Sequence, residues 1–290
     1  MSITILDGSI GQELVKRLGD TPTPLWSVSV MLEAPDLVTE VHQRYFEAGA
    51  EIATLNTYNV LRDRLRANGI EDKFETLLKA AQDHAIKARD VFGGGKIASS
   101  IGPLGASYRP DLLPDSDEAV AAYTEIFAFH DDVVDMHLVE TVVSLRHVEV
   151  VLKAAEGANK PIWLAVSLDD DNPSTLRSGE ALADVQSLIE AYKPDAALVN
   201  CSTPEAVTAG LPIVASWGVP FGAYANGFTK ISDGFLTDSP TVDALSARTD
   251  LDPNAYADFV QKWVDMGATI IGGCCEVGPD HIAELKRRFG

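Results

Sequence analysis

The sequence predicts a single-domain α/β protein that folds as a (β/α)8 TIM barrel over residues 1–290. Eight short apolar runs alternate along the chain with longer amphipathic segments, and the runs are nearly continuous, as in parallel strands covered by helices. The chain of 290 residues also suits eight such units, which need about 250 residues. A doubly wound open sheet is the alternative, but no glycine-rich dinucleotide fingerprint follows the first run.

The predicted strands are short runs rich in aliphatic residues, and a small or polar residue follows each of them. Their length is too short for helices and their apolar content is too uniform for a half-exposed sheet. They are expected at residues 4–6, 51–55, 96–100, 136–139, 161–167, 196–200, 221–225 and 268–272.

The predicted helices carry apolar residues at every third or fourth position, as Leu37, Val41, Tyr45 and Ala48 illustrate. They are expected from the first strand to residue 18 and at 35–48, 74–91, 118–134, 145–155, 181–192, 253–266 and 279–289, with a shorter piece at 205–209. The polar, aperiodic segment 229–252 is expected to be a long loop that can cover the barrel mouth.

The composition excludes several classes of partner. With 43 acidic and 23 basic residues the formal charge is −20, which argues against nucleic acid and anionic membranes. No apolar stretch is long enough to span a bilayer, and the N-terminus lacks the features of a signal peptide, so a cytoplasmic location is expected. The cluster 169–171 is interpreted as a solvated loop rather than a calcium loop. The oligomeric state is left open.

Three cysteines are the most informative residues of the chain. Cys201 ends the sixth apolar run, and Cys274 and Cys275 follow the eighth. Strands six and eight of a barrel both border strand seven, so the three thiols can converge, provided that Gly272 and Gly273 let the chain bend. Three thiolates with a fourth position open predict a zinc site that activates a substrate thiol, as a thiol methyltransferase requires. Because their number is odd, we do not expect the cysteines to form a disulfide framework.

Other polar residues at strand ends suit an amino-acid substrate, because barrel active sites gather at the carboxyl ends of the strands. Asp7 and Glu140 are expected to receive an ammonium group. The alternatives are a helix N-cap role for Asp7 and an ion pair with a barrel neighbour for Glu140. Gly8, Ser9 and Ile10 open the first helix, whose free N–H groups suit a carboxylate.

Longer motifs reveal a resemblance that covers nearly the whole chain. The chain resembles the homocysteine S-methyltransferases, and the pair of motifs around the cysteines is the most specific part of the match. The motifs are Asp7-Gly8-Ser9-Ile10-Gly11-Gln12-Glu13-Leu14, Leu25-Trp26-Ser27, Glu47-Ala48-Gly49-Ala50, Asn56-Thr57-Tyr58, Gly102-Pro103, Glu140-Thr141, Val199-Asn200-Cys201 and Gly272-Gly273-Cys274-Cys275.

The resemblance implies a zinc-containing barrel that methylates homocysteine to methionine. It implies that the three cysteines bind Zn²⁺ and that Glu140, assisted by Asp7, binds the homocysteine ammonium group. It further implies that Asn226 holds the fourth position of the zinc before homocysteine arrives. Asn56 and Tyr58 are similar to residues of the mouth near the zinc and the methyl donor. The donor is expected to be S-methylmethionine, S-adenosylmethionine or betaine.

Two departures from the family pattern bear on function. Glu276 stands where the family usually has glycine, and either places a charge near the metal or points to water. The segment 108–117 also differs from the usual loop. A non-catalytic zinc or thiol-ligand binding protein on the same barrel is therefore the alternative function. A metal-independent lyase or aldolase is a third, but it needs a lysine at a strand end, and the lysines fall mainly on predicted helices and loops.

Overall fold

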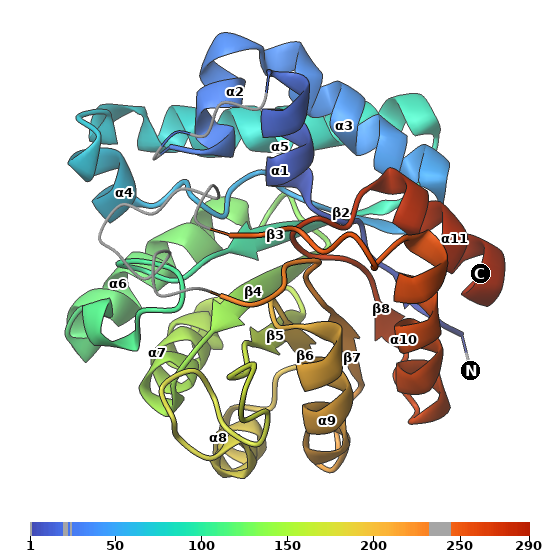
Figure 1. Ribbon diagram of the computed structural model, residues 1–290. Coiled ribbons are helices and arrows are strands. Elements are labelled where there is room, and N and C mark those ends of the chain that lie inside the picture. Colours follow the sequence, from blue (N-terminus) through green and yellow to red (C-terminus); the bar gives the residue numbers. More distant parts are fainter. Residues whose placement is uncertain (1, 20–22, 24, 232–244) are drawn as a thin grey trace.

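Eight parallel strands form one sheet, and helices pack around it (Figure 1). The computed structural model describes residues 2–19, 23, 25–231 and 245–290. The strands neighbour one another in the order β1-β8-β7-β6-β5-β4-β3-β2, and a parallel bridge between Leu6 and Ile52 joins the two ends. This order confirms the (β/α)8 barrel and rules out the doubly wound sheet. The strands are Thr4–Ile5 (β1), Ile52–Thr54 (β2), Lys96–Ile101 (β3), Met136–Val142 (β4), Ile162–Val166 (β5), Ala196–Asn200 (β6), Phe221–Tyr224 (β7) and Ile270–Ile271 (β8).

The helices begin where the sequence supplies caps. Proline occupies the first turn of α3, α9, α10 and α11, where its missing N–H costs nothing. Ser144, Thr203 and Asp252 accept N–H groups at the starts of α7, α9 and α10. None of the described helices is both long and apolar enough to cross a membrane. The helices are Ile10–Arg17 (α1), Ser27–Glu33 (α2), Pro35–Ala48 (α3), Arg62–Ala67 (α4), Phe74–Phe92 (α5), Ser116–His130 (α6), Leu145–Ala154 (α7), Val185–Tyr192 (α8), Pro204–Ala215 (α9), Pro253–Asp265 (α10) and Pro279–Phe289 (α11).

Five helices differ from the prediction. Two are shorter than expected, since α6 ends at His130 rather than at residue 134 and α8 begins at Val185 rather than at residue 181. The helices α2 and α4 were not expected, because each is too short to show an apolar period; α4 buries only Leu65. The helix α9 has 12 residues, whereas only 205–209 was expected. The prediction stopped early because Pro212 lies inside the helix and interrupts the helical pattern in the sequence.

Strand β4 also differs from the prediction, and the difference affects the site. It runs to Val142 instead of ending at residue 139, so Glu140 lies inside the strand and not beyond it. Its register with β5 shifts between Val139 and Val142, and Thr141 has a φ of 59°. Such a bulge redirects the side chains beside it, so the backbone at Thr141 helps to set the direction of Glu140.

The barrel interior is filled by alternate residues of the strands. On β6, Ala196 and Leu198 pack inside the barrel, whereas Ala197 and Val199 pack against the helices. The same alternation on the other strands produces a compact inner cluster made of Leu6, Ile52, Ala98, Met136, Leu138, Ala165, Ala196, Leu198, Tyr224 and Ile270. This filled interior leaves the carboxyl ends of the strands as the place for a site.

The predicted loop 229–252 is described only at its two ends, since residues 232–244 lie outside the described residues. The N–H of Thr229 donates to the carbonyl of Ser246 at 2.9 Å, and Phe228 forms an antiparallel bridge with Ala247. The two ends of the segment therefore lie side by side.

Strands β7 and β8 approach so closely at Gly222 that any side chain there would collide. A Cβ atom at this position would lie 1.8 Å from the carbonyl oxygen of Ile270. We expect Gly222→Ala to lower the free energy of unfolding by at least about 1–3 kcal/mol, since the two strands must separate. Gly94→Ala is the control, because no atom lies within 4 Å of the added methyl group. Chemical denaturation measures both, and equal stability of the two variants would contradict the close approach.

Candidate active site

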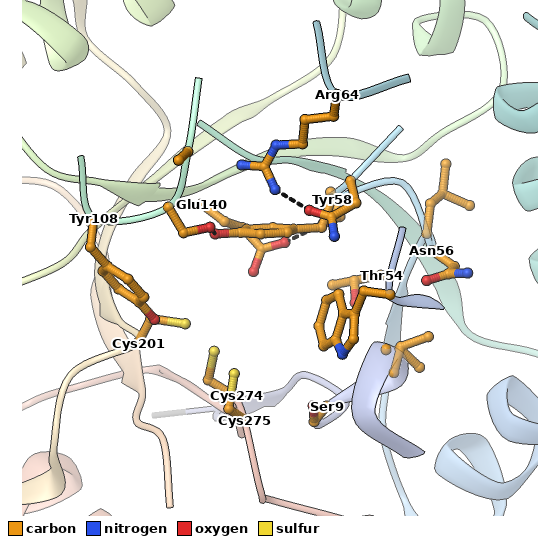
Figure 2. A pocket seen from close by; sticks show the side chains of 18 of the residues that line it. Ser9, Thr54, Asn56, Tyr58, Arg64, Tyr108, Glu140, Cys201, Cys274 and Cys275 are labelled. Carbon is orange, nitrogen blue, oxygen red and sulfur yellow. Dashed lines mark hydrogen bonds between the residues drawn. The ribbon is translucent and has the colours of Figure 1, made fainter. Parts of the chain in front are cut away.

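A cavity of about 320 Å³ opens at the carboxyl ends of the strands, where the sequence places the site. Most of the predicted site residues lie together around it, although they come from distant parts of the chain (Figure 2). Those that line it are Asp7, Gly8, Ser9, Ile10, Asn56, Tyr58, Glu140, Cys201, Cys274 and Cys275. Asn226 is the one predicted site residue that does not line the cavity.

The three cysteine sulfurs converge at one side of this cavity. Cys201 directly follows β6, and Cys274 and Cys275 follow β8, so the thiols meet across the end of β7 (Figure 2). Their sulfur atoms all lie within 4.8 Å of one another. A tetrahedral metal with sulfur ligands at about 2.3 Å needs sulfurs roughly 3.8 Å apart, so a small contraction suffices. Within the described part of the chain, this is the one cluster of its kind that is suited to a metal.

Cys201 reaches the cavity through an unusual backbone conformation. Its φ is 47°, in the left-handed region that residues with a side chain rarely adopt. Its carbonyl oxygen accepts hydrogen bonds from Ser167 Oγ at 3.1 Å and from Arg177 Nη2 at 3.0 Å. The Arg177 guanidinium also pairs with Asp170 at 3.0 Å and lies 4.7 Å from the centre of the Tyr108 ring. These contacts hold the turn in place.

Part of the acidic cluster 169–171 therefore has a structural function. Asp170 is nearly buried, because it pairs with Arg177 and also accepts the N–H of Thr203 at 2.9 Å. The prediction of a solvated loop is correct for Asp171 but wrong for Asp170. A lone acidic triplet gave no signal that one of its members faces an arginine.

The vicinal cysteines are held by backbone hydrogen bonds. The N–H of Cys274 donates to Ala225 O at 2.9 Å, and the carbonyl of Cys275 accepts the N–H of Gly227 at 2.7 Å. We expected Gly272 and Gly273 to let the chain bend here, and neither of them needs a positive φ to do so. A more specific constraint acts on Gly273. This residue is required for space, since a Cβ atom there would lie 2.1 Å from Val277.

Glu276 neither lines the cavity nor points freely to water. Its carboxylate accepts from Gln12 Nε2 and pairs with Lys16, both at 2.7 Å, and its own N–H donates to Gln12 Oε1 at 2.6 Å. Its φ is 64°, so a glycine would adopt this turn with less strain. Glu276 thus ties the cysteine loop to helix α1, which neither of its two predicted roles anticipated.

Hydrogen bonds among the three thiols shift their pKa values in opposite directions. Hydrogen bonds from Cys274 and Cys275 lower the pKa of Cys201 well below its usual value, with smaller contributions from Tyr108 and Thr141. Donating those bonds raises the pKa values of Cys274 and Cys275. A thiolate therefore forms first at Cys201, where it can ligate a cation.

Glu140 faces the cysteines across the cavity. Ser100 Oγ donates to one carboxylate oxygen at 2.5 Å and Tyr224 donates to the other at 3.1 Å. Burial raises the pKa of Glu140 to about 7, and the nearby Cys201 charge adds to the rise. The predicted alternative, an ion pair with a barrel neighbour, is wrong, because its partners are hydroxyl groups.

Asp7 is fixed to strand β2 rather than to the start of helix α1. The N–H of Thr54 donates to its carboxylate at 2.6 Å, and the Thr54 hydroxyl donates at 3.0 Å. The N-cap alternative for Asp7 is wrong, since Ser9 occupies that position and makes no side-chain cap. Burial raises the pKa of Asp7, and the charge of Glu140 adds to the rise.

The start of helix α1 forms another wall of the cavity. The hydroxyl of Ser9 donates to Gln12 at 3.2 Å, while its N–H donates to Val277 O at 3.0 Å. Gly8 is required for space, since a Cβ atom would lie 2.1 Å from the same carbonyl oxygen. The N–H of Ser9 is thus not free for a substrate carboxylate, contrary to the expectation of open N–H groups here.

Asn56 and Tyr58 lie in the mouth as predicted. Asn56 Nδ2 donates to the carbonyl of Ser27 at 3.3 Å, and the Tyr58 hydroxyl bonds with Ser107 at 2.8 Å. The ring of Tyr58 meets Trp26 edge to face, with 6.3 Å between the ring centres. Together they give the cavity an aromatic side.

Asn226 lies behind the cavity wall. It is fully buried, and its Oδ1 accepts the N–H of Phe228 at 3.0 Å. Its Nδ2 is buried without a partner, which is uncommon for an amide in a folded protein. The side chain must turn or shift before its oxygen can bind a metal at the thiols, since it does not line the cavity.

Several cavity residues were missed by the sequence analysis. Strand position alone could have found Ser100, which ends a predicted strand, whereas Tyr108 and Arg64 lie in segments without a period. The missed residues that line the cavity include Trp26, Thr54, Arg64, Ser100, Tyr108 and Tyr224.

Known proteins share both the fold and the sequence of this chain. A family model described as homocysteine S-methyltransferase matches residues 4–289. The homocysteine S-methyltransferase of Escherichia coli (strain K12) is 30% identical over 308 residues, which cover 99% of this chain and 95% of that protein. The selenocysteine Se-methyltransferase of Brassica oleracea var. italica is 24% identical, with 98% and 88% covered.

A solved structure agrees with these relatives. The crystal structure of the homocysteine methyltransferase MmuM from Escherichia coli, in its metallated form, matches with a TM-score of 0.82 at 27% identity and covers 99% of this chain and 96% of that one. The family model spans almost every residue of the barrel, and its range includes the three cysteines of the thiol cluster. The chain is therefore an enzyme of the homocysteine S-methyltransferase family.

Proposed function

We propose that this enzyme uses zinc to transfer a methyl group from a sulfonium or ammonium donor to the thiol of homocysteine, giving methionine. The donor is S-methylmethionine, S-adenosylmethionine or betaine. The observation that carries the proposal is the convergence of three cysteine sulfurs beside a cavity that also holds two carboxyl groups, the buried Asp7 and the half-buried Glu140. The reduced thiols that this needs fit a cytoplasmic location.

The chemistry of the three thiol ligands supports zinc at this site. Thiolates are soft ligands that favour zinc over magnesium or calcium, and three of them leave a fourth tetrahedral position for a substrate. Cys201, Cys274 and Cys275 would hold the ion, and Asn226 is the proposed occupant of the fourth position before homocysteine binds. The zinc would lower the pKa of a thiol bound to it, so that this thiol becomes a nucleophile at neutral pH.

The two carboxyl groups support an amino-acid acceptor. We assign Glu140 to the homocysteine ammonium group, with Asp7 as its neighbour on the same side of the cavity. An arriving ammonium group favours the ionised form of Glu140, whose raised pKa otherwise keeps it partly protonated. Gly8 and Ser9 are assigned to the carboxylate of homocysteine, through the Gly8 N–H and through the Ser9 hydroxyl once it rotates away from Gln12.

The aromatic side of the cavity supports a cationic donor. The faces of Trp26 and Tyr58 attract an onium group, and Asn56 lies beside them in the mouth. The homocysteine sulfur attacks the methyl carbon, the bond from that carbon to the donor onium atom breaks, and its electron pair neutralises the donor. The thiol proton leaves to solvent. Positioning of the two substrates is the main contribution of these residues to the rate.

The alternative of a non-catalytic binding protein has lost its support. It depended on Glu276 altering the metal site. The charge of Glu276 does reach Cys275 and helps to raise its pKa, but this side chain pairs with Gln12 and Lys16 and does not line the cavity where substrates would bind. The lyase alternative is also unsupported, because no lysine lines the cavity within the described residues.

Replacing a proposed zinc ligand tests the metal. We expect Cys201→Ser to reduce bound zinc from about one per chain to less than a tenth of that, because two thiolates do not hold the ion in this geometry. Methionine formation should fall by more than about 100-fold. Elemental analysis and a methionine assay measure both, and thermal unfolding shows whether the barrel remains folded. Full activity after removal of the metal by a chelator would refute the proposal.

The pH dependence of homocysteine binding tests Glu140. Only the ionised carboxylate attracts an ammonium group, and the pKa of Glu140 is about 7. The KM for homocysteine should therefore rise on the order of tenfold from pH 8 to pH 6 as Glu140 becomes protonated.

The control acceptor is 4-mercaptobutanoate, which has the thiol and carboxylate of homocysteine but no ammonium group. Its KM should stay nearly constant over the same range. Glu140→Gln should remove the pH dependence for homocysteine, and a parallel rise for both acceptors would show that Glu140 does not bind the ammonium group.

A further inference from the structure

Arg64 is the one basic side chain among the described residues that line the cavity. The acidic residues that line it are Asp7, Asp63 and Glu140. Arg64 comes from helix α4 and directs its guanidinium group into the cavity from the side opposite Cys274 and Cys275 (Figure 2). Arg64 therefore supplies the one positive charge of this lining, although Asp63 stands beside it in the chain.

The charge of Arg64 is not neutralised by a carboxylate within the described part of the chain. Its Nη1 donates to Asn59 Oδ1 and its Nη2 donates to Pro103 O at 2.8 Å, and both acceptors are uncharged. The neighbouring arginines of α4 differ, since Arg62 pairs with Glu125 at 2.6 Å. Among the three arginines of α4, Arg64 is the one that lines the cavity and the one without an acidic partner.

The acid next to Arg64 is not available to it. Asp63 accepts the N–H of Gly105 at 2.6 Å with one oxygen and the backbone N–H of Arg64 at 2.9 Å with the other. Moreover, Arg64 Nε is buried and has no hydrogen-bond partner. A buried donor left unpaired costs free energy, so the guanidinium group is not fully satisfied by its protein partners.

The position of Arg64 matches one end of an onium substrate. Its guanidinium carbon lies 5.6 Å from the centre of the Tyr58 ring, and the same ring contacts Trp26. A guanidinium group has five N–H donors, of which the two contacts above use two. Nη1 and Nη2 each keep one N–H for a carboxylate, which an arginine binds with two parallel hydrogen bonds.

We propose that Arg64 binds the carboxylate of the methyl donor and restricts the donors to small onium compounds that carry a carboxylate. The assignment rests on the proposed function. Homocysteine also carries a carboxylate, but its thiol is assigned to the cysteines and its carboxylate to Gly8 and Ser9. The cysteines and Ser9 lie across the cavity from Arg64 (Figure 2). The onium group of the donor then lies between Arg64 and the thiols, and its methyl group faces the acceptor sulfur.

The test compares two donors that differ only in this group, S-methylmethionine and its carboxamide. In Arg64→Gln, the KM for S-methylmethionine should rise roughly 10- to 100-fold, the range that charged hydrogen bonds provide. The kcat at saturation and the KM for homocysteine should change little. The carboxamide should be a poor donor for the unchanged enzyme and no worse for the variant. Arg64→Lys should fall between, and Arg62→Gln is the matched control from the same helix.

Calorimetric binding of S-methylmethionine and betaine separates this assignment from the proposed function, because it requires no turnover. Loss of binding in Arg64→Gln but not in Arg62→Gln supports the assignment even if no methionine forms, in which case only the proposed reaction fails. The assignment is overturned if these donors bind equally well to Arg64→Gln, if neither binds to the unchanged enzyme, or if the KM for homocysteine rises instead.

Discussion

The left-handed turn at Cys201 is the constraint on which the site depends. Side chains alternate along β6, with Ala196 and Leu198 inside the barrel, so the regular strand would direct Cys201 toward the helices. A φ of 47° turns the residue back toward the cavity, at a cost of about 1–3 kcal/mol for a residue with a side chain. Ser167 and Arg177 bind the carbonyl oxygen of this residue and offset that cost. Without this turn, Cys274 and Cys275 would be the only two sulfur ligands available to a metal at this site.

A second strained residue connects this turn to the substrate side of the site. Thr141 has a φ of 59°, and its N–H and hydroxyl group bond with the side chain of Asn200 at 3.0 and 3.2 Å. Asn200 directly precedes Cys201, so one buried amide joins the bulge of β4 to the end of β6. The strand ends that carry Glu140 and Cys201 are thereby held together through the buried side chain of Asn200. Strain of this kind is typical of sites that must be held ready before a substrate binds.

The strands and the thiol cluster could be predicted from the sequence because each depends on a local signal. A buried parallel strand is a continuous apolar run, and barrel topology then places Cys201 beside Cys274. Arg177 and Arg64 carry no such signal, since they stand in a loop and in a helix of six residues. Their roles arise from contacts between segments distant in sequence. The fixing of Asp7 to Thr54 and the salt bridge of Glu276 with Lys16 were missed for the same reason.

Net charge is a poor guide to what this cavity recognises. The chain carries a formal charge of −20, which on average repels anions, yet much of that charge belongs to exposed carboxylates that solvent screens. Inside the cavity Arg64 is the one basic side chain of the described lining and forms no ion pair there, so it can attract a carboxylate locally, because interactions away from bulk water are screened less. The thiols and Glu140 attract cations at the other end of the cavity. An onium compound with a carboxylate matches both ends, and the fields at the two ends align its methyl group toward the cysteines. Orientation of the donor thus follows from charge separation within the cavity and requires no net positive surface.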